Sequence, residues 1–432
     1  MLLPLGTSAG VDRGRAEGVT IASGTSEQPA TAVEGTSEEP ERRTAIGTGV
    51  LLTVVAWFLS RCVVGAGWGP ARNPLIFDPY LWGRWDSINY FGIAQHGRTF
   101  GRCGSPGLPA TGLTHMLHLV WCGSAGWLPG YPWLIRGLGT TGISVADAGL
   151  IISWVAMAAA LFLVWLGWAR DLAPGRALLV LLAFGLFPGS VYNFAFFPTS
   201  LALACTVGAV LAATRERFLT GAVLFTLAGL CYPSAWFAAA GVAVGLVLLA
   251  LPLGAGAVVR RALWGLAGLI SLLVLGIHDQ IAFGHYNAFV LMDAAPSLRA
   301  PGFPGRDLWR LVFQRTTSEQ IRIGRFGAAV LAVQAVVAAC LTGGALLVSA
   351  IAWRRRTLVA AQLYPALLAL GVVLGVVIDS ATGGAWNRSI VLAAPVVVCL
   401  RRQPIAMLAL IVVLMGTTTA SISHFFFTST LV

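Results

Sequence analysis

Lysine is missing from this 432-residue sequence, and charge of either sign is scarce. All 28 basic residues are arginine, 17 residues are acidic, and charged residues make up 10% of the chain. A soluble globular domain has about 25% charged residues. Hydrophobic residues supply 57% of this chain instead. The composition excludes an ordinary soluble domain and indicates a membrane protein.

The sequence also lacks signals for nucleic-acid, nucleotide and zinc binding. The formal net charge of +11 does not indicate nucleic-acid binding, because the arginines lie mostly at the ends of apolar runs. Arginine in that position orients membrane spans. The sequence has no glycine-rich phosphate loop between a strand and a helix, and no cysteine–histidine spacing fits a zinc site. We therefore expect no nucleic-acid partner, no cofactor and no required metal.

Residues 1–44 have little apolar surface. The stretch "GTSEQPATAVEGTSEEPERR" is rich in Ser, Thr, Glu, Pro and Gly, and such a segment cannot offset the entropy of ordering. The sequence predicts a disordered cytoplasmic tail over 1–44 and an integral membrane domain over 45–432. An apolar core does not occur near the start, so we expect an uncleaved first span rather than a signal peptide.

Apolar runs dominate the rest of the chain. A helix needs about 20 residues to cross the hydrocarbon core of a bilayer, and several runs are shorter, which suggests tilted or partly inserted helices. We expect an all-α polytopic protein with about eleven transmembrane helices. The candidate runs are 45–66, 149–169, 177–194, 197–213, 219–232, 235–251, 262–277, 326–352, 358–378, 386–400 and 405–419.

Arginines recur in alternate connections between these runs. They are Arg42, Arg43, Arg170, Arg176, Arg215, Arg217, Arg260, Arg261, Arg354, Arg355, Arg356, Arg401 and Arg402. The positive-inside rule makes these connections cytoplasmic. The sequence therefore predicts a multi-pass cell-membrane protein with a cytoplasmic N-terminus and two long exoplasmic loops, about 67–148 and 278–325.

The two exoplasmic loops have distinct compositions. The first is rich in tryptophan, which concentrates at membrane surfaces, so we expect short interfacial helices there. The same loop contains Cys103 and Cys122, whose pairing an exoplasmic location permits but their spacing leaves open. The second loop carries six arginines, which either form a solvated face or bind phosphate groups.

The stretch "GRWDSINYFGIAQHGR", residues 83–98, concentrates polar and aromatic residues directly after the first span. Asp86 has two interpretations. It caps the helix predicted for "INYFGIA", with Arg84 balancing its charge, or it serves as a general base beside a low-dielectric wall. His96 is the other titratable candidate, as a base or as a structural hydrogen-bonding group.

Two segments resemble a known family. "RWDSINYFGIAQHG", residues 84–97, and "WLPGYPWLIR", residues 127–136, are similar to the paired signatures of PIG-V-like mannosyltransferases. These are relatives of GPI mannosyltransferase II and have bacterial members, especially among actinobacteria. The first family signature reads R-W-D, a gap, then Y-x-x-I-A-x-x-G, and the second resembles F-P-L-Y-P-L-L-I-R. The likeness extends to "AWNRSIVLAAPVVV", residues 385–398, and covers most of the chain after the tail.

This resemblance implies a GT-C-type glycosyltransferase with an exoplasmic active site. The implied reaction moves a mannosyl residue from a polyprenyl-phosphate-linked donor to an unidentified acceptor glycan, glycolipid or protein by one inverting displacement. It also implies that Asp86 is the base. The residues expected to bind the donor phosphate are Arg84, Arg136 and Arg388. Those expected to bind the substrate are Trp85, Asn89, Tyr90, His96 and Tyr131.

The sequence departs from the family pattern at three positions. Thr199 stands where relatives commonly have an acidic residue, Tyr232 replaces an arginine, and His285 replaces an aspartate. These departures leave the donor sugar, the acceptor and the activity open. Asp279, Asp293 and Asp379 could assist Asp86, or they could simply end helices.

Two other functions remain as alternatives. A non-catalytic membrane subunit of a glycosylation complex would explain the missing acidic residues. A lipid or sugar transporter would explain the many spans, but it should bury ionisable residues near mid-membrane and often has internal repeats. We identify neither feature in the sequence. Oligomeric state is not predicted.

Overall fold

Helices form nearly all of the described chain. The computed structural model describes residues 38–67, 79–84, 86–106, 108, 120–293, 318–379 and 383–428. Residues 1–44 and 45–432 form separate units, and the second unit holds the architecture of interest. The expected disordered state of the tail concerns residues that mostly lie outside the described ones.

Within the described residues, seven helical segments are long and apolar enough to cross a membrane. They are formed by α1 (Glu38–Ala66), α6 (Val145–Val164) with η1 (Trp165–Ala169), α11 (Ser234–Ala250) with η2 (Leu251–Leu253), α12 (Ala255–Ala267) with α13 (Ile270–Phe283), α16 (Ser318–Arg354), α17 (Ala360–Asp379) and α19 (Ile405–Phe427). The expectation of a multi-pass, all-α membrane protein is confirmed.

Four shorter apolar segments complete the bundle. They are α7 (Pro174–Gly185), α9 (Thr199–Thr214), α10 (Phe218–Cys231) and the segment Asn387–Leu400. This last segment contains the end of α18 (Gly383–Ile390) and all of η3 (Val391–Leu400). Each of the eleven predicted runs overlaps one long or short segment. Prolines limit the short ones, because Pro198 precedes α9 and Pro233 follows α10. The number of membrane crossings and the GT-C fold stay predictions.

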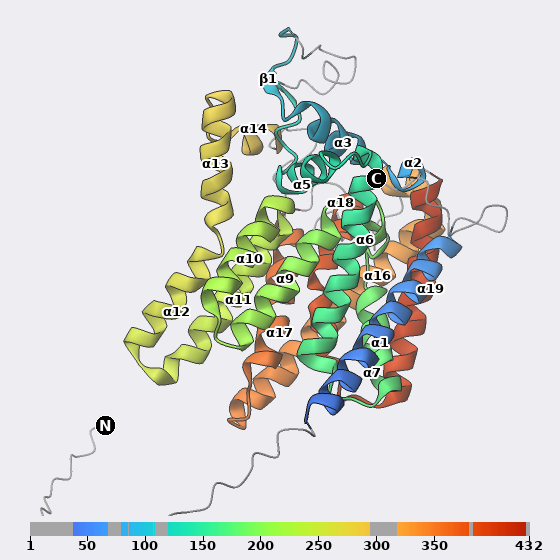
Figure 1. Cartoon of the computed structure of the whole chain (residues 1–432), viewed down its shortest axis with the longest axis vertical. Coiled ribbons are helices and arrows are strands. Elements are labelled where there is room, and N and C mark those ends of the chain that lie inside the picture. The colour runs from blue at the N-terminus through green and yellow to red at the C-terminus, as the bar shows by residue number, and fades with distance from the viewer. Residues whose placement is uncertain are drawn as a thin grey trace, which may run out of the picture. The chain divides into compact units, whose positions relative to one another are not determined.

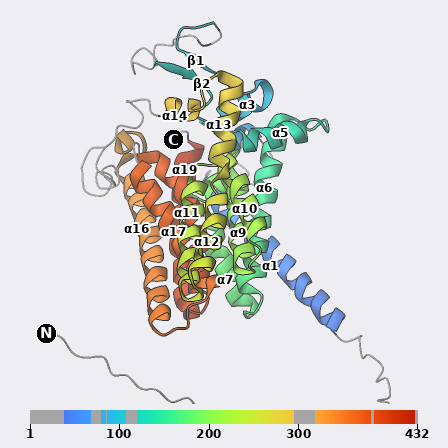
Figure 2. The same ribbon diagram turned by 90° about the vertical axis from the view of Figure 1, so that its left-hand side faces the viewer.

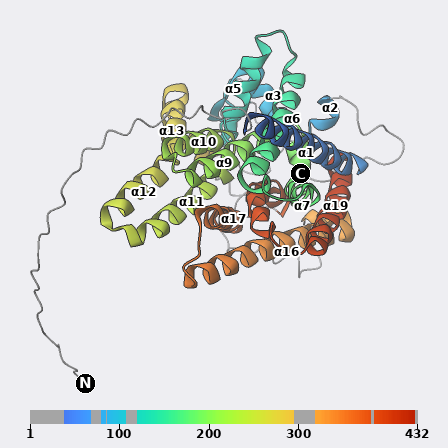
Figure 3. The ribbon, with the colours of Figure 1, turned by 60° about the horizontal axis from the view of Figure 1, so that its bottom comes forward.

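The helices lie side by side (Figures 1 and 2), and η3 lies among them, packed against α7, α9, α16 and α17. Helix α11 packs extensively on α17, and α17 also packs on α16 (Figure 3). Glycine permits this approach, because a Cβ at Gly371 would lie 2.2 Å from the carbonyl oxygen of Phe237. Small residues at helix contacts are a common means of packing in membranes.

One end of the bundle carries a set of short elements that we call the cap (Figures 1 and 2). The cap consists of α2 (Pro79–Trp82), α3 (Ser87–His96), β1 (Phe100–Arg102), β2 (Trp121–Gly123), α5 (Gly130–Gly139) and α14 (Ala288–Asp293). Short helices were expected here, whereas the hairpin was not. The strands pair antiparallel, with Gly101 opposite Cys122. A disulfide joins Cys103 to Cys122, which resolves the pairing that the spacing left open.

The second predicted loop begins later than expected. Helix α13 continues to Phe283, five residues beyond the predicted boundary at residue 278, and α14 follows it. The polar residues of "HDQIAF", residues 278–283, indicated a loop, but they are still helical. The helix ends only at Gly284, whose φ of 70° suits a glycine. Most of the loop's arginines lie outside the described residues.

The opposite end of the bundle, here called the basic end, carries the connections after η1, α9, η2, α16 and η3 (Figure 1). Two of these connections meet, since Arg176 donates to the carbonyl of Arg401 at 3.5 Å and Arg401 donates to that of Trp168 at 3.4 Å. The gathering of arginines at one end agrees with the pattern from which the topology was predicted.

The cap and the basic end should lie on opposite sides of a membrane. Thr140→Cys in the cap and Arg355→Cys at the basic end place thiols at exposed positions. In intact cells an impermeant maleimide should label one of the two, and both should react after permeabilisation. The chain without an added cysteine is the control. Equal labelling of both positions in intact cells would contradict this arrangement.

The disulfide should stabilise the cap. It closes a loop of 19 residues, and a loop of that size corresponds to about 3 kcal/mol in the chain-entropy treatment. Replacing Cys103 and Cys122 together by serine should therefore lower the unfolding temperature of the purified protein. Reductant should lower the unfolding temperature of the wild type and leave the double variant unchanged. A reductant effect of equal size in both proteins would contradict this assignment.

Candidate functional site

An ion pair joins two segments that are far apart in the sequence. Arg388 in α18 donates a hydrogen bond to the carboxylate of Asp86, which directly precedes α3. The two side chains are 19% and 23% exposed, so the pair is reachable without being fully solvated. The structure thus unites the predicted base with one of the predicted phosphate-binding arginines.

The backbone before α3 holds Asp86 in place. Ser87 accepts a hydrogen bond from the Arg84 backbone N–H at 3.0 Å and donates one to the Phe196 carbonyl at 3.0 Å. The Phe196 N–H donates to the carbonyl of Trp82, also at 3.0 Å. These bonds fix the turn against the segment that follows α8 (Val191–Phe194).

The helix-capping interpretation of Asp86 is wrong. Its side chain makes no capping hydrogen bond, and its backbone already has helical φ and ψ. A capping residue normally has an extended backbone, which directs its side chain back to the first-turn N–H groups. The carboxylate of Asp86 binds Arg388 instead, so a residue 302 positions away balances its charge.

Aromatic side chains pack beside the pair. Tyr90 is 5% exposed, and its ring meets those of Tyr131 and Phe197 edge to face at 5.8 and 6.2 Å. The Tyr131 hydroxyl donates to the Gly149 carbonyl at 2.8 Å. Burial and the nearby charge of Asp86 raise the pKa of Tyr90 well above its ordinary value, and burial also raises the pKa of Tyr131. Both phenols therefore stay neutral near pH 7.

Two positions where the chain departs from the family pattern lie close to the pair. The Tyr232 hydroxyl forms a hydrogen bond of 3.2 Å with Ser389, next to Arg388. Thr199 donates to the carbonyl of Tyr192 at 2.7 Å. The side chains of Tyr192 and Tyr232 both lie near the Arg388 guanidinium. Tyr232 was noticed in the sequence only as a missing arginine, and its hydroxyl is part of this site.

A buried amide adjoins the pair. Asn387 is fully buried, and within the described residues its side-chain nitrogen and oxygen have no hydrogen-bond partner. The same holds for Asn193 in α8. A buried polar group without a partner costs about 1–3 kcal/mol, so such groups commonly bind water or a ligand. Asn193 lies in the apolar run 177–194 and Asn387 in the run 386–400, so the sequence analysis did not identify either amide as a site residue.

Two other predicted site residues, Arg136 and His96, lie at the far end of α3 from Asp86. Arg136 donates to the carbonyls of Ala94 and Ile93 at 2.9 and 3.0 Å, so it binds the last turn of α3. Asp86 lies at the other end of that helix, about 10 Å away along its axis. His96 is exposed on the last turn, and Asn89 is half-buried on the first. Trp85 lies outside the described residues.

A second ion pair is completely buried. Arg98 pairs with Asp279 of α13, with side chains only 2% and 0% exposed. Arg98 also donates to the Ala125 carbonyl, and the Phe289 N–H donates to Asp279 at 3.2 Å. Burial lowers the pKa of Arg98, and the hydrogen bond to Asp279 opposes that shift. Asp279 therefore ties α13 and α14 to the loop after α3, and its carboxylate is not turned toward Asp86.

His285, the third departure from the family pattern, lies at the hairpin. Its ring meets Trp121 and Phe100 at 5.2 and 5.4 Å, and these two rings stack on each other at 4.8 Å. The side chains of Asp293 and Asp379 lie outside the described ones. The aspartates proposed as assistants to Asp86 thus receive no support from the contacts of the described residues.

Arg61 is a buried arginine that the sequence analysis missed. It lies in α1 at 3% exposure, with its guanidinium 4.4 Å from the Trp82 ring and 4.6 Å from the Trp154 ring. Cation–π contacts of this kind favour a desolvated arginine. An ionisable residue inside an apolar run is itself a sequence signal. Arg61, Arg261 and Asp279 each lie within two turns of an end of their own helix.

Within the described residues, no three His, Cys, Asp or Glu side chains are grouped to hold a metal ion. The expectation that no metal is required stays a prediction. No protein-family model matches this chain, and no curated protein matches it either. The resemblance to PIG-V-like mannosyltransferases therefore stays a hypothesis that depends on the motifs and on the contacts described above.

Breaking the buried pair should destabilise the protein strongly. Arg98→Gln leaves the Asp279 carboxylate buried without its cation, which typically costs about 3–5 kcal/mol. The double variant Arg98→Gln with Asp279→Asn should recover part of that loss, because neutral side chains need no counter-charge. Thermal unfolding in detergent measures both. A single variant as stable as the wild type would contradict the assignment.

Proposed function

We propose that this protein is a membrane glycosyltransferase of the PIG-V-like kind, with a GT-C fold. It would transfer a mannosyl residue from a polyprenyl-phosphate-linked donor to an exoplasmic glycan, glycolipid or protein. The observation that carries the proposal is the ion pair between Asp86 and Arg388. Each partner comes from a segment that resembles the family, and 302 residues separate them.

The two side chains suit the two ends of such a reaction. The planar guanidinium of Arg388 matches phosphate oxygens, which are the leaving group of a lipid-phosphate donor. The carboxylate of Asp86 can take the proton of an acceptor hydroxyl as its oxygen attacks. In the free protein the two groups neutralise each other, so neither charge is left alone beside the apolar bundle.

Donor binding would separate the pair. A phosphate that enters beside Arg388 competes with Asp86 for the same N–H groups, because both ligands are anionic oxygens. When the guanidinium turns to the phosphate, the carboxylate is released as a base. Asp86 would therefore act only after the donor is in place, which limits unproductive reaction with water.

The chemical step then needs one displacement. The acceptor oxygen forms a bond to the anomeric carbon while the bond from that carbon to the phosphate oxygen breaks. The acceptor proton moves to Asp86, polyprenyl phosphate leaves against Arg388, and the anomeric configuration inverts. The amide of Asn387, which is next to Arg388 and has no hydrogen-bond partner within the described residues, could bind a polar substrate.

The position of the site agrees with a lipid-linked donor. The pair lies at the cap end of the apolar bundle, where the polar head of a membrane lipid can reach it. We infer that the basic end faces the cytoplasm and that this site opens to the exoplasmic side of the cell membrane. Such a donor diffuses within the bilayer and needs no nucleotide pocket.

Transfer of radiolabelled mannose from polyprenyl-phosphate-mannose tests the proposal. Membranes containing Asp86→Asn should transfer label about 10²–10⁴-fold more slowly than the wild type, the usual contribution of a general base. Arg388→Gln should raise the KM for the donor. Asp171→Asn makes the same chemical change at an exposed position of the basic end and should retain full activity.

The outcomes distinguish the alternatives. Equal rates for the wild type and an equally expressed Asp86→Asn variant would eliminate the proposed role of Asp86. If the wild type transfers nothing from a verified donor while a control enzyme does, mannosyl transfer from this donor is wrong. The non-catalytic subunit, which the changes at Thr199 and His285 favour, would then be the better explanation. The fraction that carries label in a positive assay identifies the acceptor class.

A further inference from the structure

Helix α18, which carries Arg388, is held near that residue from two directions. Arg388 binds Asp86 at the start of α3. The next residue, Ser389, forms a hydrogen bond of 3.2 Å with the hydroxyl of Tyr232 at the end of α10. Consecutive residues of a helix point about 100° apart. The two bonds therefore restrain both the place of α18 and its rotation about its own axis.

Tyr232 is a firmly placed partner for Ser389. It is 5% exposed and lies at the turn between α10 and α11. Its N–H donates to the Ala228 carbonyl at 2.9 Å, and its own carbonyl accepts from the Ala235 N–H at 3.1 Å. Pro233 follows it, and the proline ring fixes the backbone there. The backbone of Tyr232 is thus held on both sides.

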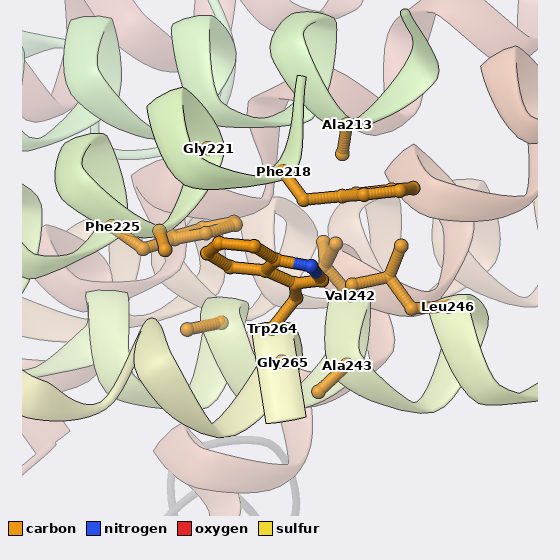
Figure 4. A pocket seen from close by; sticks show the side chains of 11 residues that line it. Ala213, Phe218, Gly221, Phe225, Val242, Ala243, Leu246, Trp264 and Gly265 are labelled. Atoms are coloured by element: carbon orange, nitrogen blue, oxygen red, sulfur yellow. The ribbon is translucent and has the colours of Figure 1, made fainter. Parts of the chain in front are cut away.

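The two helices that this turn joins are packed on their neighbours. Phe218 of α10 and Leu246 of α11 lie around the indole of Trp264 in α12 (Figure 4). At the other end of α10, a Cβ at Gly130 of α5 would lie 2.8 Å from the Leu230 carbonyl oxygen, so α10 ends directly against the cap. Close packing at both ends of α10 gives the turn a defined position.

The residue on the other side of Arg388 is in close backbone contact with the segment after α7. A Cβ at Gly189 would lie 2.0 Å from the Asn387 carbonyl oxygen, and Gly189 has a φ of 84°. Glycine suits both the contact and the positive φ. Arg388 therefore lies between a residue packed on Gly189 and a residue bonded to Tyr232.

Donor binding would remove one of the two side-chain bonds of α18. In the proposed function, a phosphate takes the Arg388 guanidinium away from Asp86. Among the described side chains of α18, Ser389 would then make the hydrogen bond that still ties the helix to another segment. A guanidinium binds phosphate best when its planar fork meets the oxygens squarely. A helix that could rotate at this moment would weaken that contact.

We infer that Tyr232 is a positioning residue, which acts through Ser389 to hold Arg388 in the orientation that receives the donor phosphate. This role rests on the proposed function, in which Arg388 binds that phosphate. A neutral phenol can orient α18 without placing a second positive charge beside the guanidinium. The sequence analysis noted Tyr232 only as the replacement of an arginine, and the bond to Ser389 gives it a task of its own.

A double-mutant cycle tests this role. Tyr232→Phe and Ser389→Ala each remove one partner of the bond. Each should raise the KM for polyprenyl-phosphate-mannose about two- to tenfold, while kcat stays within about twofold. The combined variant should bind the donor no more weakly than the single variants, because all three lack the same bond. Tyr364→Phe makes the same change at a buried position near the basic end and should leave the KM unchanged.

Stabilisation by polyprenyl phosphate gives a second readout that does not need transfer. The purified protein is titrated with polyprenyl phosphate, and thermal unfolding is followed in detergent. Tyr232→Phe should need about two- to tenfold more ligand than the wild type for the same rise in unfolding temperature. In an Arg388→Gln background the same change should have no further effect. This dependence on Arg388 distinguishes positioning from a general loss of packing.

The outcomes separate this role from the proposed function. Wild-type KM and ligand response in Tyr232→Phe, or an effect that persists without Arg388, would overturn the inference and leave transfer by Asp86 standing. If the wild type transfers no mannose but its polyprenyl phosphate response follows the cycle, mannosyl transfer is wrong and the role of Tyr232 stands. A wild type that neither transfers mannose nor responds to polyprenyl phosphate would overturn both.

Discussion

An arginine taken out of water inside an apolar bundle needs an anion or an aromatic face beside it, and the cap of this protein is organised around that need. Arg388 binds Asp86, Arg98 binds Asp279, and Arg61 lies between the rings of Trp82 and Trp154. Each contact joins segments far apart in the chain.

The three contacts differ in exposure, and this difference bears on the role that we propose for the Asp86–Arg388 pair. Arg98 and Asp279 are sealed off, so their pairing can only hold the hairpin, α13 and α14 together. Asp86 and Arg388 are each about one-fifth exposed. This partial exposure is what the proposed function requires, because a ligand must be able to reach the pair.

Much of this architecture could be predicted from the sequence because it depends on local properties. Every apolar run corresponds to a helical segment, since hydrophobicity and length largely determine a membrane helix. Asp86, Tyr90 and Tyr131 were singled out from two short motifs and lie together in the fold. The motifs could not show which arginine meets Asp86. Arg84, Arg136 and Arg388 were predicted as phosphate ligands, and the tertiary packing brings Arg388 to Asp86.

Other features depend on contacts that no local pattern reveals. Arg136 looked like a phosphate ligand, yet the carbonyl groups at the end of α3 take up its guanidinium. Asp279 was assigned to a loop because its neighbours are polar, whereas Arg98 compensates its charge and allows the helix to continue past it. The hairpin likewise depends on the pairing of two three-residue strands that are separated by 18 residues.

The segment after Arg388 is longer along its axis than an α-helix with the same number of residues. Residues Val391–Leu400 form a 3₁₀ helix and are nearly all buried among neighbouring helices. A 3₁₀ helix rises about 2.0 Å per residue against 1.5 Å for an α-helix, so ten residues cover about 20 Å instead of about 15 Å. The surrounding protein shields its weaker hydrogen bonds from lipid. Ten residues therefore connect Arg388 near the cap with the arginines of the basic end over a greater distance than an α-helix of the same length would cover.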